Sequence, residues 1–216
     1  MMGKASRLVL RKSSIFTISD YGKSVYGEKI SKEGQRYLRQ WNPKRSKLAA
    51  LLTKETRFIP FTEDSKVLYL GAASGTTVSH VADLVPGGRV YGVELSYVPF
   101  LKLLELSEAR SNIIPILEDA RALEKYQFLV DSPDIIYQDI SQRDQVSIFN
   151  QAIKFWPTIR YGFLVLKIRS ISFSRRDNEI LRESVQGIKG MKVKYTVDLK
   201  PFHMNTFMLC LSRSQT

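Results

Sequence analysis

From Lys66 onward, short apolar segments alternate along the chain with longer stretches that favour helix. We expect strands at 67–70, 89–94, 113–116, 134–137, 163–168, 193–197 and 207–211, and helices near 76–85, 98–110, 121–130, 142–156 and 175–189. Apolar strands separated by helices are typical of a mostly parallel sheet that is covered on both faces. The last two strands have no helix between them, so we expect an antiparallel edge. The pattern therefore predicts an α/β fold with a doubly wound, seven-stranded sheet.

The first forty residues follow a different pattern. Short extended pieces at 7–10, 15–18 and 25–26 are separated by turn residues. We therefore predict a small, basic, β-rich domain over residues 1–40 and a larger domain over residues 41–216. A helix-prone amphipathic run at 44–52 lies at the start of the larger domain.

The charge of the chain is concentrated near its N-terminus. The 216 residues include 33 Lys and Arg against 21 Asp and Glu, a formal net charge of +12. Residues 1–54 hold 13 of the basic side chains and only three of the acidic ones. This excess is either a solvated basic face or a surface that binds the phosphates of a nucleic acid.

The composition excludes several classes of protein. The single cysteine, Cys210, excludes an internal disulfide framework and the usual four-ligand zinc sites, and we predict no metal site. No apolar run approaches the roughly 18–20 residues that a membrane-spanning helix needs. Arg11 and Lys12 interrupt the apolar stretch near the N-terminus, which argues against a secretory signal. We expect a soluble intracellular protein that does not bind a membrane.

The first strand of the expected sheet runs directly into a loop of small residues, 71–77, and then into a helix. Gly71 and Ala72 allow the backbone to approach a ligand, and the helix N-terminus offers free N–H groups. Ligands of such sheets bind beyond the carboxyl ends of the strands. Glu94, at the end of the second strand, can accept hydrogen bonds from both hydroxyls of a ribose. Asp119, after the third strand, can accept one from the amino group of adenine.

Four interpretations of this loop compete. Its spacing differs from Gly-x-Gly-x-x-Gly, which disfavours an NAD-dependent dehydrogenase, and it lacks the Gly-Lys-Ser or Gly-Lys-Thr of a P-loop. A purely structural tight turn remains the alternative to a ligand site. Because Glu94 and Asp119 follow the next two strands, we predict S-adenosylmethionine as the cofactor.

Three stretches of the sequence, KVLYLGAASGTTVSHV at 66–81, WNPKRSKLAA at 41–50 and NIIPI at 112–116, resemble motifs of the fibrillarin family. The resemblance runs from about Val25 to the C-terminus. It implies a Rossmann-like S-adenosylmethionine-dependent methyltransferase fold, with a mostly parallel seven-stranded sheet, an antiparallel edge and a small N-terminal β appendage. It also implies methyl transfer to a ribose 2′-hydroxyl of rRNA or tRNA in a box C/D ribonucleoprotein.

The resemblance further implies partners. They are a box C/D guide RNA that selects the target nucleotide, a Nop-type scaffold protein and, indirectly, a kink-turn-binding ribosomal-type protein. With a guide, the enzyme needs no base-specific contact, so we expect Lys44 and Arg45 to contact the RNA backbone. A Gly-Arg-rich tail is absent, which favours an archaeal-type cytoplasmic protein over a nucleolar eukaryotic one.

The family pattern carries over onto particular residues of this chain. It implies cofactor contacts at Thr76, Thr77, Glu94, Leu95, Asp119, Ala120, Asp139 and Gln142. Related 2′-O-methyltransferases use a Lys-Asp-Lys group, which Lys47, Asp139 and Lys167 match. We assign Lys167 as the base, although a lysine at a strand end can also simply reach solvent.

Two positions depart from the family pattern. Ser141 stands where the family usually has alanine, and Thr206 aligns with a histidine that is usually the fourth residue of the catalytic group. A threonine cannot replace an imidazole as an acid or base. His203, three positions earlier, is either a shifted substitute or a surface histidine. The departure leaves an alternative function, a fibrillarin-like RNA-binding assembly factor with little or no methyltransferase activity.

Overall fold

The computed structural model describes residues 6–11 and 14–213. Residues 1–5 lie outside the described residues. They belong to the predicted basic segment and to the N-terminal stretch in which we expect no secretory signal. The strands are β1 (Leu8–Arg11), β2 (Ser14–Ser19), β3 (Ile30–Glu33), β4 (Arg36–Gln40), β5 (Lys66–Leu70), β6 (Arg89–Glu94), β7 (Ile113–Leu117), β8 (Ile135–Gln138), β9 (Tyr161–Lys167), β10 (Lys192–Asp198) and β11 (Thr206–Ser212). The helices are α1 (Lys47–Lys54), α2 (Thr76–Leu84), α3 (Tyr97–Ala109), α4 (Leu123–Tyr126), α5 (Gln145–Phe155), α6 (Ile168–Ile171) and α7 (Asp177–Gln186).

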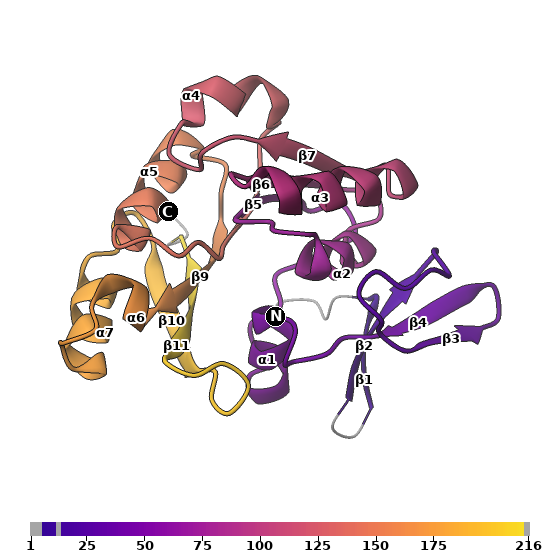
Figure 1. Cartoon of the computed structure of the whole chain (residues 1–216), viewed down its shortest axis with the longest axis horizontal. Helices are drawn as coiled ribbons and strands as arrows, with labels where there is room; N and C mark the ends of the chain where they lie inside the picture. Colours follow the sequence, from indigo (N-terminus) through magenta and orange to yellow (C-terminus); the bar gives the residue numbers. More distant parts are fainter. Residues whose placement is uncertain (1–5, 12–13, 214–216) are drawn as a thin grey trace.

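Seven strands form the main sheet, in the order β10-β11-β9-β8-β5-β6-β7 (Figure 1). The five strands from β9 to β7 are parallel, and β11 pairs antiparallel with both β9 and β10. The α/β fold and its antiparallel edge are therefore confirmed. The strand order reverses at β5, whose neighbours β6 and β8 leave in opposite directions along the sheet. A ligand crevice is expected at such a point, beyond the carboxyl ends of the strands.

Helices cover the sheet on both faces because its strands are apolar on both sides. Val67 and Tyr69 of β5 pack into one core with the buried residues of α1 and α2. Leu68 and Leu70, which alternate with them, pack into the other core with α4 and α5. Alternation of side chains along a strand thus places the two cores on opposite faces.

A second sheet, with the antiparallel order β1-β2-β4-β3, lies beside α2 (Figure 1). The prediction of an extended segment at 25–26 is wrong. Glu28 accepts hydrogen bonds from the amides of Val25 and Tyr26, and the segment forms a bend. Strands β3 and β4 were not expected. In β3 only Ile30 is apolar, and in β4 the polar Arg39 is buried beside Leu38, so neither strand shows a clear apolar pattern.

Near the site, two elements have bounds that differ from those expected. The strand predicted at 163–168 ends at Lys167, where the short helix α6 begins. The helix predicted at 121–130 consists of α4 and a 3-10 turn at Gln127–Leu129. Among the described residues, no helix is long and apolar enough to cross a membrane.

Candidate methyl-transfer site

The loop after β5 lies directly against the end of β8. Gly71 has φ of +83°, and a Cβ atom at this position would lie 2.7 Å from the carbonyl oxygen of Asp139. The amides of Gly71 and Ala72 donate to the Val93 carbonyl at 2.9 and 3.0 Å. Only glycine combines this conformation with so close an approach. The contact brings the ends of β5, β6 and β8 together.

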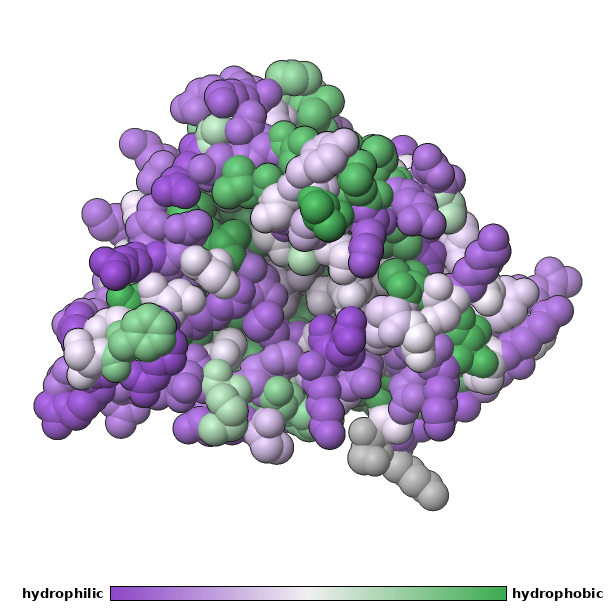
Figure 2. Space-filling view, in the orientation of Figure 1, coloured by the Kyte–Doolittle hydropathy of each residue, from purple (hydrophilic) through white to green (hydrophobic). Residues whose placement is uncertain are grey.

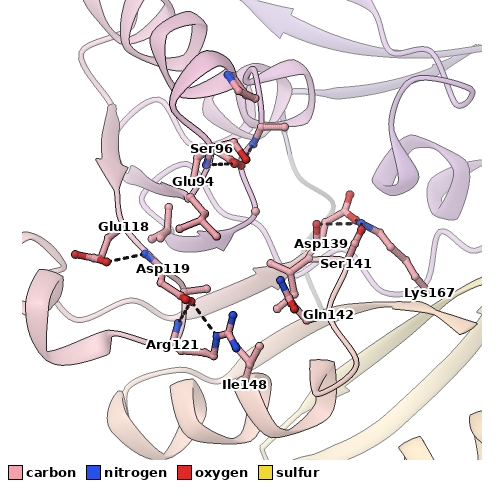
Figure 3. Close-up of a pocket in the computed structure, with 17 residues that line it drawn as sticks. Glu94, Ser96, Glu118, Asp119, Arg121, Asp139, Ser141, Gln142, Ile148 and Lys167 are labelled. Atoms are coloured by element: carbon pink, nitrogen blue, oxygen red, sulfur yellow. Dashed lines mark hydrogen bonds and ion pairs between the residues drawn. The ribbon is translucent and has the colours of Figure 1, made fainter. Parts of the chain in front are cut away.

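A cavity of about 400 Å³ opens at this edge of the sheet (Figure 3). Of the residues predicted to bind the cofactor or to act in catalysis, eight line it: Gly71, Glu94, Leu95, Asp119, Ala120, Asp139, Gln142 and Lys167. Ala72, Thr76, Thr77 and Lys47 do not belong to its lining. Residues at the ends of the five parallel strands β5 to β9 thus meet in one cavity, as the spacing of the motifs predicts.

The Glu94 carboxylate is fixed by the backbone on either side of it. Its Oε2 accepts a hydrogen bond from the Ala73 amide and its Oε1 accepts one from the Ser96 amide, both at 2.8 Å (Figure 3). Each carboxylate oxygen keeps a further lone pair for a ligand. The arrangement presents a rigid acceptor to the cavity.

Asp119 is held in a similar way at the end of β7. Its Oδ1 accepts hydrogen bonds from the Arg121 amide at 2.9 Å and from Arg121 Nε at 3.1 Å. Burial would raise the pKa of Asp119, but these bonds and the charge of the guanidinium outweigh it and lower the pKa below its ordinary value. Asp119 is therefore ionised and acts as an acceptor.

Two lysines from distant parts of the chain meet at Asp139. Lys47 Nζ lies 2.8 Å from Oδ2, and Lys167 Nζ lies 2.7 Å from Oδ1. Lys167 also donates to the Ser141 hydroxyl at 2.8 Å and to the Asp139 carbonyl at 3.2 Å. We call Lys47, Asp139 and Lys167 the ion triad. Its side chains are 14–22% exposed, so the charges are partly shielded from water and open to a substrate.

The position of Lys47 follows from local chemistry in the sequence. Ser46 caps α1 by accepting a hydrogen bond from the Ala49 amide, so Lys47 is the first residue of the helix. The Ser46 hydroxyl also accepts a bond from Thr77 Oγ1 at 3.0 Å, which joins the start of α1 to the start of α2. Thr77 is thus buried at this junction beside the cavity.

The remaining predicted residues lie around the site. Thr76 lies in the wall of a second groove, together with Arg45. Lys44 and Arg45 are exposed on the loop before α1, and the Arg45 guanidinium carbon lies 5.8 Å from the centre of the Tyr26 ring. Thr206 pairs with Lys167 across β11 and β9, and His203 lies on the turn before β11.

Four residues that contribute to the site were not predicted. Ser141 binds Lys167, Ser96 and Ala73 hold Glu94 through their amides, and Arg121 holds Asp119. Ser141 follows Asp139 by two positions at a strand end, which is a usable signal for a site residue. The backbone donors leave no signal in the sequence, because any residue supplies an amide.

Comparisons with known proteins agree with this geometry. The profile of the family named Fibrillarin matches residues 9–215. The chain belongs to the fibrillarin family. It is 45% identical over 208 residues to the fibrillarin-like rRNA/tRNA 2′-O-methyltransferase of Picrophilus torridus, an alignment that covers 96% of this chain and 98% of the relative. The resemblance seen in the sequence motifs is confirmed.

Solved structures of fibrillarins share the fold. A fibrillarin/Nop5p complex matches with a TM-score of 0.87 at 40% identity, covering 96% of this chain and 98% of the matched chain. Aeropyrum pernix fibrillarin in complex with natively bound S-adenosyl-L-methionine matches with a TM-score of 0.83 at 38% identity, covering 92% and 88% of the two chains. The predicted methyltransferase fold is confirmed by these fibrillarins.

Proposed function

We propose that this fibrillarin-family chain transfers a methyl group from S-adenosylmethionine to a ribose 2′-hydroxyl of rRNA and tRNA. One observation carries the proposal: the ion triad stands at the edge of the cavity that Glu94 and Asp119 line. The names of the relatives support the reaction and the substrate class. The assignment of individual residues rests on the geometry.

The cavity suits S-adenosylmethionine. Glu94 offers a fixed carboxylate for the ribose hydroxyls of the cofactor, and Asp119 offers an acceptor for its adenine amino group. Gly71 has no side chain and that of Ala120 is small, so their backbone can lie close to the cofactor. Leu95 and Gln142 complete the wall of the cavity. When bound, S-adenosylmethionine supplies a methyl group on a positively charged sulfonium. The carboxylate of Asp139, which lines the same cavity, attracts that positive charge.

Lys167 is the residue that we propose to accept the proton of the 2′-hydroxyl. It lines the cavity, whereas Lys47 reaches Asp139 from α1, outside the lining. A lysine must be neutral to act as a base. Lys47 binds the other oxygen of the same carboxylate, and we assign it to hold the ribose or its phosphate.

The proposed partners include a Nop-type scaffold protein, because a related fibrillarin has been crystallised with Nop5p. Apolar side chains gather around α3 on the surface (Figure 2). Leu95, Tyr97, Val98, Leu101, Leu104 and Leu117 are 40–70% exposed on α3 and beside the ends of β6 and β7. Contiguous apolar surface of this kind is typical of a protein-binding site.

A box C/D guide RNA and, through the scaffold, a kink-turn-binding protein complete the proposed assembly. Lys44 and Arg45 are exposed near Lys47 and suit contacts with RNA phosphates. The relatives from Picrophilus torridus and Methanocaldococcus jannaschii are archaeal proteins, and a cytoplasmic location forms part of the proposal.

The experiment that tests the function is methyl transfer by the reconstituted ribonucleoprotein. The complex is supplied with labelled S-adenosylmethionine and an RNA that pairs with the guide, and the modified atom is mapped. We expect methylation at the 2′-oxygen of the nucleotide that the guide selects, and its loss in Asp139→Asn. Absence of methyl transfer by the wild-type complex would favour the alternative function of an assembly factor.

A further inference from the structure

Position 206 supplies no group to the ion triad. Thr206 lies opposite Lys167 in the pairing of β11 with β9, and it is buried. Its hydroxyl donates to the Met204 carbonyl at 2.9 Å, within the turn that precedes β11. The threonine therefore stabilises its own turn.

The imidazole of the same turn contacts the loop before α1. His203 is half-buried, and its Nε2 lies 2.9 Å from the carbonyl oxygen of Pro43. A carbonyl oxygen only accepts hydrogen bonds, so Nε2 carries the hydrogen and donates it. With Nε2 used in this way, His203 is not placed to exchange a proton with a substrate through that nitrogen.

The bond acts on the segment that delivers Lys47. Pro43 lies in a turn in which the amides of Arg45 and Ser46 both donate to the Asn42 carbonyl at 3.0 Å. Ser46 then caps α1, and Lys47 follows as the first helical residue. A displacement of the Pro43 carbonyl therefore moves the start of α1.

The β10–β11 turn also holds the other end of α1, and Figure 1 shows this turn beside the helix. Lys54, the last residue of α1, donates to the Asp198 carbonyl at 2.7 Å. Leu199 is fully buried in the core that contains Leu48, Leu51 and Leu52. Contacts at both ends and along the helix fix α1 against the turn, and His203 supplies the turn's hydrogen bond near the Lys47 end.

The electrostatic surroundings suit this task. Burial, followed by the positive charge of Lys47, lowers the pKa of His203 below its usual value. The imidazole is therefore neutral near neutral pH. It can donate from Nε2 without placing another cation beside Lys47.

We infer that His203 is a positioning residue, which holds Lys47 in the ion triad by binding the Pro43 carbonyl. The inference rests on the proposed function of the triad. It gives the lone histidine of this turn a role that is distinct from acid–base catalysis.

The test compares His203→Ala with His203→Gln in single-turnover methylation by the reconstituted ribonucleoprotein, at saturating cofactor and RNA. Loss of one hydrogen bond to a positioned group should lower the rate of the alanine variant by about five- to tenfold. Glutamine keeps an N–H donor, so its rate should return to within about twofold of wild type. Met204→Ala, an exposed neighbour on the same turn, serves as the control and should retain the wild-type rate.

A second comparison separates positioning from a general structural role. In a Lys47→Ala background, His203→Ala should cause no further loss of rate, because the histidine acts through Lys47. A wild-type rate in His203→Ala, a glutamine variant as slow as alanine, or an undiminished effect in the Lys47→Ala background would each overturn the inference. If the wild-type complex transfers no methyl group, the proposed function fails, and this inference fails with it.

Discussion

At the scale of single residues, the site depends on polar groups whose partners hold them in one orientation. Glu94 accepts two backbone hydrogen bonds, Asp119 is held by Arg121, and Asp139 is held between two ammonium groups. Such groups need not reorganise when a ligand binds, which lowers the cost of binding. This rigidity leads to predictions for particular side chains.

Glu94→Ala should weaken the binding of S-adenosylmethionine. The loss of a charged acceptor for the ribose hydroxyls should reduce the binding free energy by about 1–3 kcal/mol. Calorimetric titration of the isolated protein measures the change, with Glu105→Ala on the exposed surface of α3 as the control. Unchanged affinity in the Glu94 variant would remove this residue from the proposed cofactor site.

Gly71→Ala should destabilise the protein more than Gly27→Ala, although the two glycines have similar backbone conformations. Gly27 has φ of +87° with no atom within 4 Å of an added Cβ, whereas at Gly71 the added atom would meet the Asp139 carbonyl at 2.7 Å. The backbone strain, about 1–2 kcal/mol, is common to both, so the excess at Gly71 measures the close approach. Urea unfolding should show an excess of at least about 1 kcal/mol. Equal losses would contradict a tight contact between β5 and β8.

At the scale of elements, the strand ends were predictable from the sequence and much of their surroundings was not. Apolar runs that stop at Glu94 and Lys167, or just before Asp139, place these side chains at one edge of a parallel sheet. Strands β3 and β4 escaped prediction because β3 has one apolar residue and β4 buries the polar side chain of Arg39. The contacts of His203 and Ser141 depend on the paths of two turns, which the residue types alone do not specify.

The loop before α1 is the element that we expect to contact the RNA backbone. Neutralising Lys44 and Arg45 together should weaken RNA binding by the complex and reduce the slope of log affinity against log salt by about one per lost phosphate contact. The same pair of changes at Lys192 and Lys194, exposed on β10, should have a smaller effect. The nucleotide that is methylated should not change. A shift in the methylated position would contradict selection by the guide.

At the scale of the whole molecule, a buried polar network joins the N-terminal sheet to α2. Arg39 of β4 is fully buried between Glu28 and Asp83 and forms ion pairs with both. His80 of α2 stacks on Trp41 with ring centres 4.8 Å apart, and both of its ring nitrogens have hydroxyl partners at 2.8 Å, Thr17 and Tyr26. Removing one member of such a network leaves the others buried without a partner, so the sheet and α2 should unfold together.

The network should make the free energy of unfolding depend on pH in the acidic range. Burial alone would raise the pKa of Glu28, but the Tyr26 amide and the Arg39 guanidinium outweigh it and lower the pKa to about 2. A carboxyl group whose pKa is lowered by folding stabilises the folded protein at pH values above its unfolded-state pKa, which is near 4.3 for glutamate. This stabilisation is at most about 3 kcal/mol, and it disappears as the pH falls toward 2. In urea unfolding, the advantage of wild type over Glu28→Gln should therefore shrink between pH 5 and pH 2. His80 is unchanged in both proteins, so its own titration cancels in the difference. A constant advantage over this range would contradict the ionic role of Glu28.

The central claim is that the ion triad performs proton removal during methyl transfer, and the Lys167→Ala variant tests it most directly. In single-turnover methylation by the reconstituted ribonucleoprotein, loss of a positioned base should lower the rate by about 10²-fold or more. The affinity for S-adenosylmethionine should remain nearly intact, and Lys192→Ala should behave as wild type. A near-normal rate in Lys167→Ala would contradict the assignment of Lys167 as the base. The contradiction would be strongest if His203→Ala also caused a large loss of rate.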